Sequence, residues 1–156
     1  MSHQVRQISS VQIDSIDLLA RAVSAVYVSN LKTNLRLDPS AKQARFWNGH
    51  LDSCDAVITY VRPLTEQEKM SNYEIAVKRE TATVNGSQVP VFNLYADTHA
   101  SDREMENKLN KVFEEYEIAK LQAVAQETGA LDFQEVTSAG DFEIPQGYRC
   151  VKIVVP

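Results

Sequence analysis

Residues 101–129 read SDREMENKLNKVFEEYEIAKLQAVAQETG and predict one long helix. Ser101, with Glu104 three residues later, matches the capping box that begins many helices. Gly129 stands where a helix commonly ends on a left-handed residue. Apolar residues recur at roughly the helical period, at Met105, Leu109, Val112, Phe113, Tyr116, Ala119, Val124 and Ala125. An apolar stripe of this length has to be covered by another layer of structure.

The segments before this helix predict a strand and a second, shorter helix. Residues 5–13 fit a first strand, and Asp14 or Ser15 can cap the short helix that follows and runs to Val26. Tyr27-Val28 fits either a continuation of that helix or the start of a strand, because two residues do not separate the two periods.

The middle of the chain predicts a β-hairpin. Asn85-Gly86 lies between two alternating segments, 81–84 and 89–96, and Asn-Gly is the strongest short hairpin signal because both turn residues need a positive φ. Residues 30–45 look irregular, with a turn at Asp38-Pro39-Ser40. One helical turn fits residues 65–70, and further strands are predicted at 56–61, 73–78, 131–136, 142–144 and 148–155.

These elements predict a single α+β domain over residues 1–156. We expect a mostly antiparallel sheet with one short and one long helix packed on one face. No repeat or linker divides the chain, and residues 30–53 look like an insertion into this pattern.

The composition is that of a globular protein, with 44% hydrophobic and 24% charged residues. Cys54 and Cys150 lie far apart, so nothing indicates a secreted disulfide scaffold. No apolar run approaches the length of a membrane span, and we expect a cytoplasmic protein without a membrane partner. The net charge of -5 disfavours non-specific attraction to nucleic acid.

Several stretches, taken with the order of the predicted elements, resemble one known family. They are the opening Met1-Ser2-His3, residues 13–26, Tyr73-Glu74-Ile75, residues 111–129 and the closing strand pair. Together they are similar to the plastid hypothetical-reading-frame family (the ycf thirty-five-like domain of unknown function), which comprises small α+β proteins of algal plastids, cyanobacteria and some phages. The resemblance implies an accessory protein that acts with partners, and it supplies no catalytic residue.

A basic and aromatic segment offers a candidate binding surface for nucleic acid or a nucleotide. It contains Lys32, Arg36, Lys42, Arg45, Phe46 and Trp47. Basic side chains can hold phosphates, and an aromatic ring can stack on a base. The alternative, which we favour, is a loop whose two aromatic residues anchor it to the core.

A second candidate is a metal site, kept as a minority hypothesis of a metal-dependent enzyme. If residues 50–54 are extended, His50, Asp52 and Cys54 lie on one face, and His99 could supply a further ligand. The paired cysteines or histidines of a structural zinc site are missing from the sequence, so a polar loop is the favoured interpretation.

The long helix offers a third surface. Phe113, Ile118 and Leu121 widen its apolar stripe beyond one narrow face, as a helix does when a second subunit covers it. No complete catalytic constellation, phosphate-binding loop or cofactor motif is present in the sequence. We therefore expect a non-enzymatic protein-interaction module, oligomeric or part of a larger complex, with no cofactor.

Overall fold

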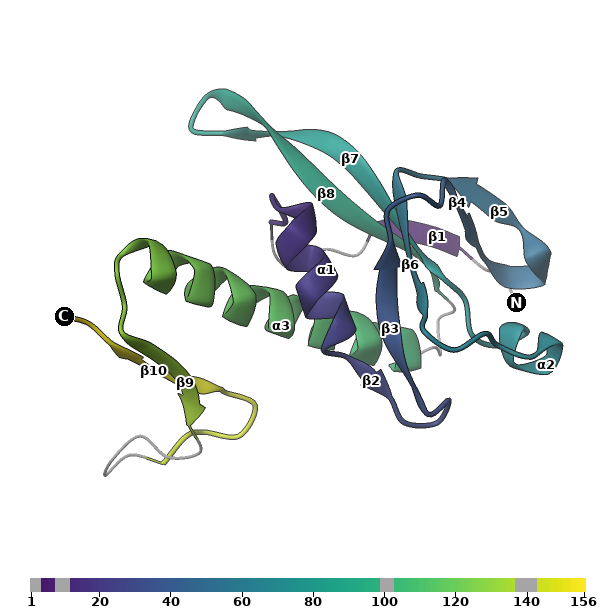
Figure 1. The fold of residues 1–156 in the computed structure, drawn as a ribbon. Coiled ribbons are helices and arrows are strands. Elements are labelled where there is room, and N and C mark those ends of the chain that lie inside the picture. Colours follow the sequence, from purple (N-terminus) through teal and green to yellow (C-terminus); the bar gives the residue numbers. More distant parts are fainter. Residues whose placement is uncertain (1–3, 8–11, 99–102, 137–142) are drawn as a thin grey trace. The chain divides into compact units, whose positions relative to one another are not determined.

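The computed structural model describes residues 4–7, 12–98, 103–136 and 143–156, and it is an α+β protein (Figure 1). The chain divides into two compact units, Met1–Tyr116 and Glu117–Pro156. The long helix α3, Arg103–Glu127, contributes residues to both units.

The first unit contains a six-stranded antiparallel sheet in the order β1-β8-β7-β6-β3-β2. Its strands are β1 Gln4–Gln7, β2 Tyr27–Val28, β3 Thr33–Asp38, β6 Ala56–Tyr60, β7 Ile75–Val84 and β8 Ser87–Thr98. A second, two-stranded sheet pairs β4 Gln43–Arg45 with β5 Leu51–Ser53. The remaining helices are α1 Ile16–Ser24, the 3-10 helix η1 Trp47–Gly49 and α2 Glu66–Lys69.

One side of the six-stranded sheet carries the main core. Directly paired residues point to the same side of a sheet, so the paired Leu35 and Tyr60 share this side. Lys108 of α3 reaches Tyr60 from the same side, with its Nζ 3.1 Å from the phenol oxygen. The helix α1 and the part of α3 before Glu117 supply the other half of this core, as predicted (Figure 1).

The opposite side of the sheet is covered in part by the β4–η1–β5 segment. The backbone N–H of Trp47 donates to Asp97 Oδ2 of β8 at 2.9 Å. Asp52 of β5 forms an ion pair with Lys78 of β7 at 3.0 Å. Asp97 and Lys78 each follow a core-facing residue in their strands, so both point to this second side.

Several local predictions are confirmed. Ser15 caps α1 by accepting the Leu18 N–H, and the 85–86 turn joins β7 to β8, with Asn85 at φ 51° and Gly86 at φ 81°. Tyr27-Val28, left open between helix and strand, is β2. The predicted cap Ser101 lies outside the described residues.

Two predictions were wrong. Residues 30–45 are not irregular, because they contain β4 and all of β3, which lies inside the sheet between β2 and β6. Only the β4–η1–β5 part of the predicted insertion at 30–53 leaves the sheet order. The short strand predicted at 142–144 does not form over Glu143 and Ile144, and Phe142 lies outside the described residues.

The second unit begins in the last turns of α3. Gly129 adopts φ 79°, and the N–H groups of Gly129 and Ala130 donate to the carbonyls of Gln126 and Ala125. These two bonds form the Schellman motif that ends a helix, so the predicted end at Gly129 is confirmed. The strands β9 Asp132–Val136 and β10 Cys150–Val154 then pair as an isolated two-stranded antiparallel sheet.

Candidate functional site

The second unit exposes an apolar surface. Among its described residues only Ala125 is buried. Alternation places one apolar row on a single side of the β9–β10 sheet, where Phe133 pairs with Ile153, and Leu131 and Val155 lie directly outside the paired residues. Leu131 is 71% exposed and Val155 is 64% exposed. The exposed large apolar residues of this unit are Leu121, Val124, Leu131, Tyr148, Ile153 and Val155, and we call them the C-terminal apolar surface.

The three residues predicted to widen the helix stripe have different environments. Phe113 lies in the core of the first unit at 3% exposure, so it cannot belong to an exposed surface. Ile118 is half-buried, and Leu121 is 45% exposed within the C-terminal apolar surface. Of the three, Leu121 fits the predicted interaction role best.

Two neighbouring pockets lie beside the β4–η1–β5 segment. The first, of about 310 Å³, is lined by Arg36, Arg45, Arg62, Lys69 and Glu74, and we call it the arginine pocket. Arg36 pairs in register with Thr59 of β6, which also lines this pocket.

The second pocket, of about 290 Å³, is the tryptophan pocket, lined by Trp47, Met70, Glu66, Arg45 and Lys69. Arg45 and Lys69 line both pockets and therefore form the wall between them. The side chain of Met70 is 75% exposed and that of Trp47 is 46% exposed.

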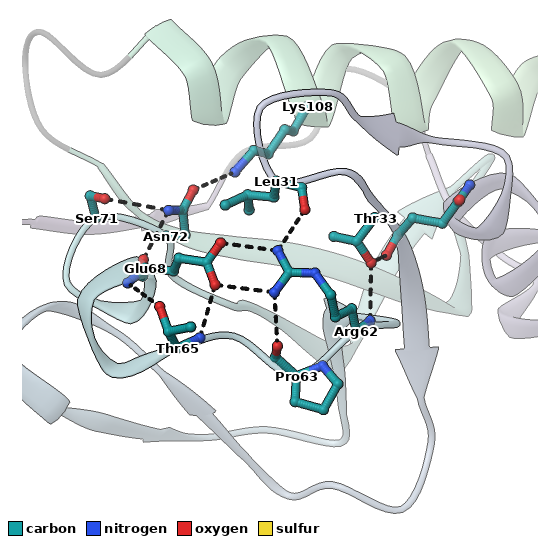
Figure 2. Close-up of polar contacts among 10 residues, drawn as sticks. Leu31, Thr33, Arg62, Pro63, Thr65, Glu68, Ser71, Asn72 and Lys108 are labelled. Atoms are coloured by element: carbon teal, nitrogen blue, oxygen red, sulfur yellow. Dashed lines mark hydrogen bonds and ion pairs between the residues drawn. The ribbon is translucent and has the colours of Figure 1, made fainter.

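The cations of the arginine pocket differ in how firmly they are held. Figure 2 shows the Arg62 guanidinium between Glu68 and the backbone: it donates to both Glu68 carboxylate oxygens at 3.0 and 3.1 Å and to the Leu31 carbonyl at 2.6 Å. The Arg45 guanidinium donates to the carbonyls of Lys69 and Asn72, both at 2.9 Å. Arg62 is therefore neutralised in place, whereas the guanidinium of Arg45 is held by neutral acceptors.

The pairing of Glu68 with Arg62 predicts an acid-sensitive contribution to stability. The hydrogen bond from Arg62, followed by that from the Thr65 amide, lowers the pKa of Glu68 from 4.5 to about 2. A carboxyl group with a lowered pKa in the folded state stabilises the protein above its unfolded pKa and loses this effect as the pH falls. In a urea unfolding series, Glu68→Gln should be less stable than wild type above pH 4.5, and the difference should shrink toward pH 2.

The control for this prediction is Glu66→Gln in the same helix. The carboxylate of Glu66 is 93% exposed and forms an ion pair with Lys69 one turn away, so its removal should change the free energy of unfolding little. A constant difference between Glu68→Gln and wild type across this pH range would contradict the assignment.

The predicted basic segment is brought together only in part. Arg36, Arg45 and Trp47 line the two pockets, but Lys32 and Lys42 line neither. Lys32 is exposed in the β2–β3 turn. The Nζ of Lys42 donates to the carbonyls of Pro39 and Asp55 at 3.1 and 2.7 Å.

Sequence reasoning missed the other two cations of the pockets. Arg62 follows β6, and Lys69 lies in α2, so both are distant in sequence from residues 32–47. The helical turn predicted at 65–70 is confirmed as α2, which begins with a Thr65–Glu68 capping box, but that turn did not indicate that Lys69 lines a pocket. No local signal places Arg62 beside Arg36.

The metal hypothesis stays a prediction. Within the described ranges, no group of three or more histidine, cysteine or acidic side chains is placed to hold a metal ion, and His99 lies outside these ranges. The Asp52 carboxylate pairs with Lys78. Burial raises the pKa of the Cys54 thiol, which disfavours the thiolate that zinc requires, and His50 is exposed.

No protein-family model, no curated protein and no solved structure matches this chain, so the resemblance to the plastid reading-frame family stays a prediction. In the described part of the chain, no helix has the length and apolar character needed to cross a membrane.

Proposed function

We propose that this protein is a non-enzymatic interaction module that self-associates through its C-terminal unit, Glu117–Pro156. The C-terminal apolar surface carries this proposal, because these six large side chains are exposed in a unit with one buried residue among those described. Chains of about 40 residues seldom bury enough surface to be stable without a disulfide, a metal or a partner. A disulfide does not stabilise this unit, because its cysteine, Cys150, is a free thiol. An isolated two-stranded hairpin is also marginal in water.

A second copy of the chain is the partner that the strand edges favour. If β9 pairs antiparallel with β9 of another copy about Gln134, then Asp132 lies opposite Val136 and Phe133 lies opposite Glu135. No like charges face each other in this arrangement. The same pairing of β10 about Lys152 would place two lysines opposite each other, which is destabilising. For pairing centred on the middle residue of each strand, the β9 edge is therefore the better contact, and it joins the two apolar rows into one larger face.

The first test is the mass of the full chain in solution, measured by sedimentation velocity. We expect a dimer, and we expect Leu131→Glu to shift it toward monomer, because the change would place a carboxylate in each of the two apolar rows that the β9 contact joins. Leu51→Glu is the matched control: Leu51 is 52% exposed on β5, outside the C-terminal unit, and this variant should stay dimeric. A wild-type chain that remains monomeric at its solubility limit would contradict the proposal.

A second variant separates the strand edge from the apolar surface. Gln134 pairs with Lys152 within the hairpin, so Gln134→Glu adds a favourable opposite charge there. In the dimer the same change places two carboxylates opposite each other. Gln134→Glu should therefore weaken the dimer without unfolding the hairpin, whereas Lys152→Gln should leave the dimer intact. If Lys152→Gln changed the dimer affinity and Gln134→Glu did not, the contact would lie on β10 instead of β9.

A further inference from the structure

We infer that the arginine and tryptophan pockets together form a binding site for a small phosphorylated ligand with a planar ring, of the nucleotide class. Both pockets lie within the first unit, so the site is independent of the proposed dimer contact. Each pocket has a volume near the lower end of the range found for small-molecule sites, about 300–1,000 Å³.

Two of the cations can be recruited by a phosphate at little cost. Arg36 lies 3.6 Å from Asp38, which is too long for a hydrogen bond, and the Asp38 carboxylate already accepts the N–H and hydroxyl of Ser40. Lys69 pairs with Glu66, whose side chain is 93% exposed. Exposed ion pairs of this kind contribute little to stability, so a bound phosphate can replace the carboxylates of Asp38 and Glu66 as the partner of each cation.

Arg45 supplies a preorganised charge at the junction of the two pockets. Its guanidinium is fixed by two backbone carbonyls rather than by a carboxylate. Glu74, the acid that lines the arginine pocket, accepts from the backbone N–H of Arg45 at 2.8 Å. Arg62 stays with Glu68 and acts as a positioning residue, because its bidentate pair is the strongest ionic contact in the pocket.

The tryptophan pocket supplies a surface for the ring of the ligand. Trp47, the only tryptophan of the chain, is 46% exposed, which is unusual for so large an apolar side chain. Met70 lines the same pocket and is 75% exposed. Stacking on an aromatic side chain contributes about 1–3 kcal/mol per base and tolerates any base. A thioether adapts to irregular planar surfaces. An anionic group in the arginine pocket would therefore place an attached ring beside Trp47.

The single tryptophan provides the assay. We expect ADP, added without metal at low salt, to change Trp47 fluorescence saturably, and adenosine or pyrophosphate alone to bind more weakly because each fills one pocket. Arg36→Ala and Lys69→Ala should each weaken ADP binding about tenfold, as expected for one charge-assisted hydrogen bond. Lys32→Ala and Lys42→Ala remove charges outside both pockets and should leave the affinity unchanged.

Three results would overturn the inference: no saturable change with ADP at low salt, equal weakening by all four substitutions, or tighter binding of a single-stranded oligonucleotide than of ADP. The last result would identify a nucleic-acid surface instead of a small-ligand site. Circular dichroism of each variant distinguishes lost binding from lost folding. Because Leu131→Glu leaves both pockets untouched, ADP binding by that variant tests this site whether or not the protein dimerises.

Discussion

Tyr116→Ala is expected to lower the free energy of unfolding by about 3–5 kcal/mol, the range found when a large buried aromatic side chain is truncated. Tyr116 is fully buried and belongs to the core of the first unit. Its hydroxyl accepts the backbone N–H groups of Asp14 and Ser15 at 3.1 and 3.3 Å and donates to Asp14 Oδ1 at 2.9 Å. The substitution would leave a cavity and would also remove the link between α3 and the start of α1. Urea denaturation measures the loss.

The conservative change Tyr116→Phe keeps the ring and removes only the hydroxyl. We expect it to cost about 1–3 kcal/mol, because the Asp14 and Ser15 amides lose an acceptor in a partly buried position. The alanine variant should therefore be clearly less stable than the phenylalanine variant. If the two variants unfold at the same urea concentration, the ring contributes no packing energy and the core assignment is wrong.

The features that the sequence predicted well are those specified within a few residues. Asn85-Gly86 requires positive φ at both positions, Ser15 offers a side-chain acceptor to the first turn of α1, and Gly129 tolerates the left-handed conformation that ends α3. Each depends on the conformational preference of one or two residues. Such preferences do not depend on what else packs nearby, which is why the sequence alone was sufficient.

The strand β3 shows the opposite case. Its buried positions alternate, with Thr33 and Leu35 buried while Arg36 is exposed, but three of its six residues are charged or amide side chains. The alternation was therefore weak, and the turn at Asp38-Pro39-Ser40 favoured an irregular interpretation. The strand forms because it pairs with β6, and that pairing joins residues 19 to 25 positions apart.

The candidate surfaces were only partly predictable for the same reason. Leu121 was identified from helix periodicity, but the apolar row on β9 and β10 depends on the register of two strands that are separated by thirteen residues in the sequence. Likewise, Arg36 and Arg45 were identified from their charge, whereas Arg62 and Lys69 join them through the positions of β6 and α2. Periodicity shows which face of an element is apolar, but it does not show what covers that face.

The neighbouring aromatic residues Phe46 and Trp47 lead to the last prediction. The sequence suggested that both anchor the segment, but Phe46 is 1% exposed and Trp47 is 46% exposed. Phe46→Ala should therefore cost about 3–5 kcal/mol. Phe46 and Ala44 are both buried in the core and both belong to the β4–η1–β5 segment. Truncating Phe46 should therefore loosen that segment before the rest of the first unit. Urea denaturation and hydrogen exchange of the β4 and β5 amides measure the two effects.

Trp47→Ala is the matched control, since it truncates an aromatic side chain one position away. Its backbone N–H bond to Asp97 Oδ2 is retained in the variant, and half-exposed side chains contribute less packing energy than buried ones. We expect Trp47→Ala to cost clearly less stability than Phe46→Ala but to abolish the ring-stacking part of ADP binding, which calorimetry measures because this variant has no tryptophan. Equal destabilisation by the two changes would mean that Trp47 anchors the segment as strongly as Phe46. The indole would then be a structural side chain, as the sequence suggested.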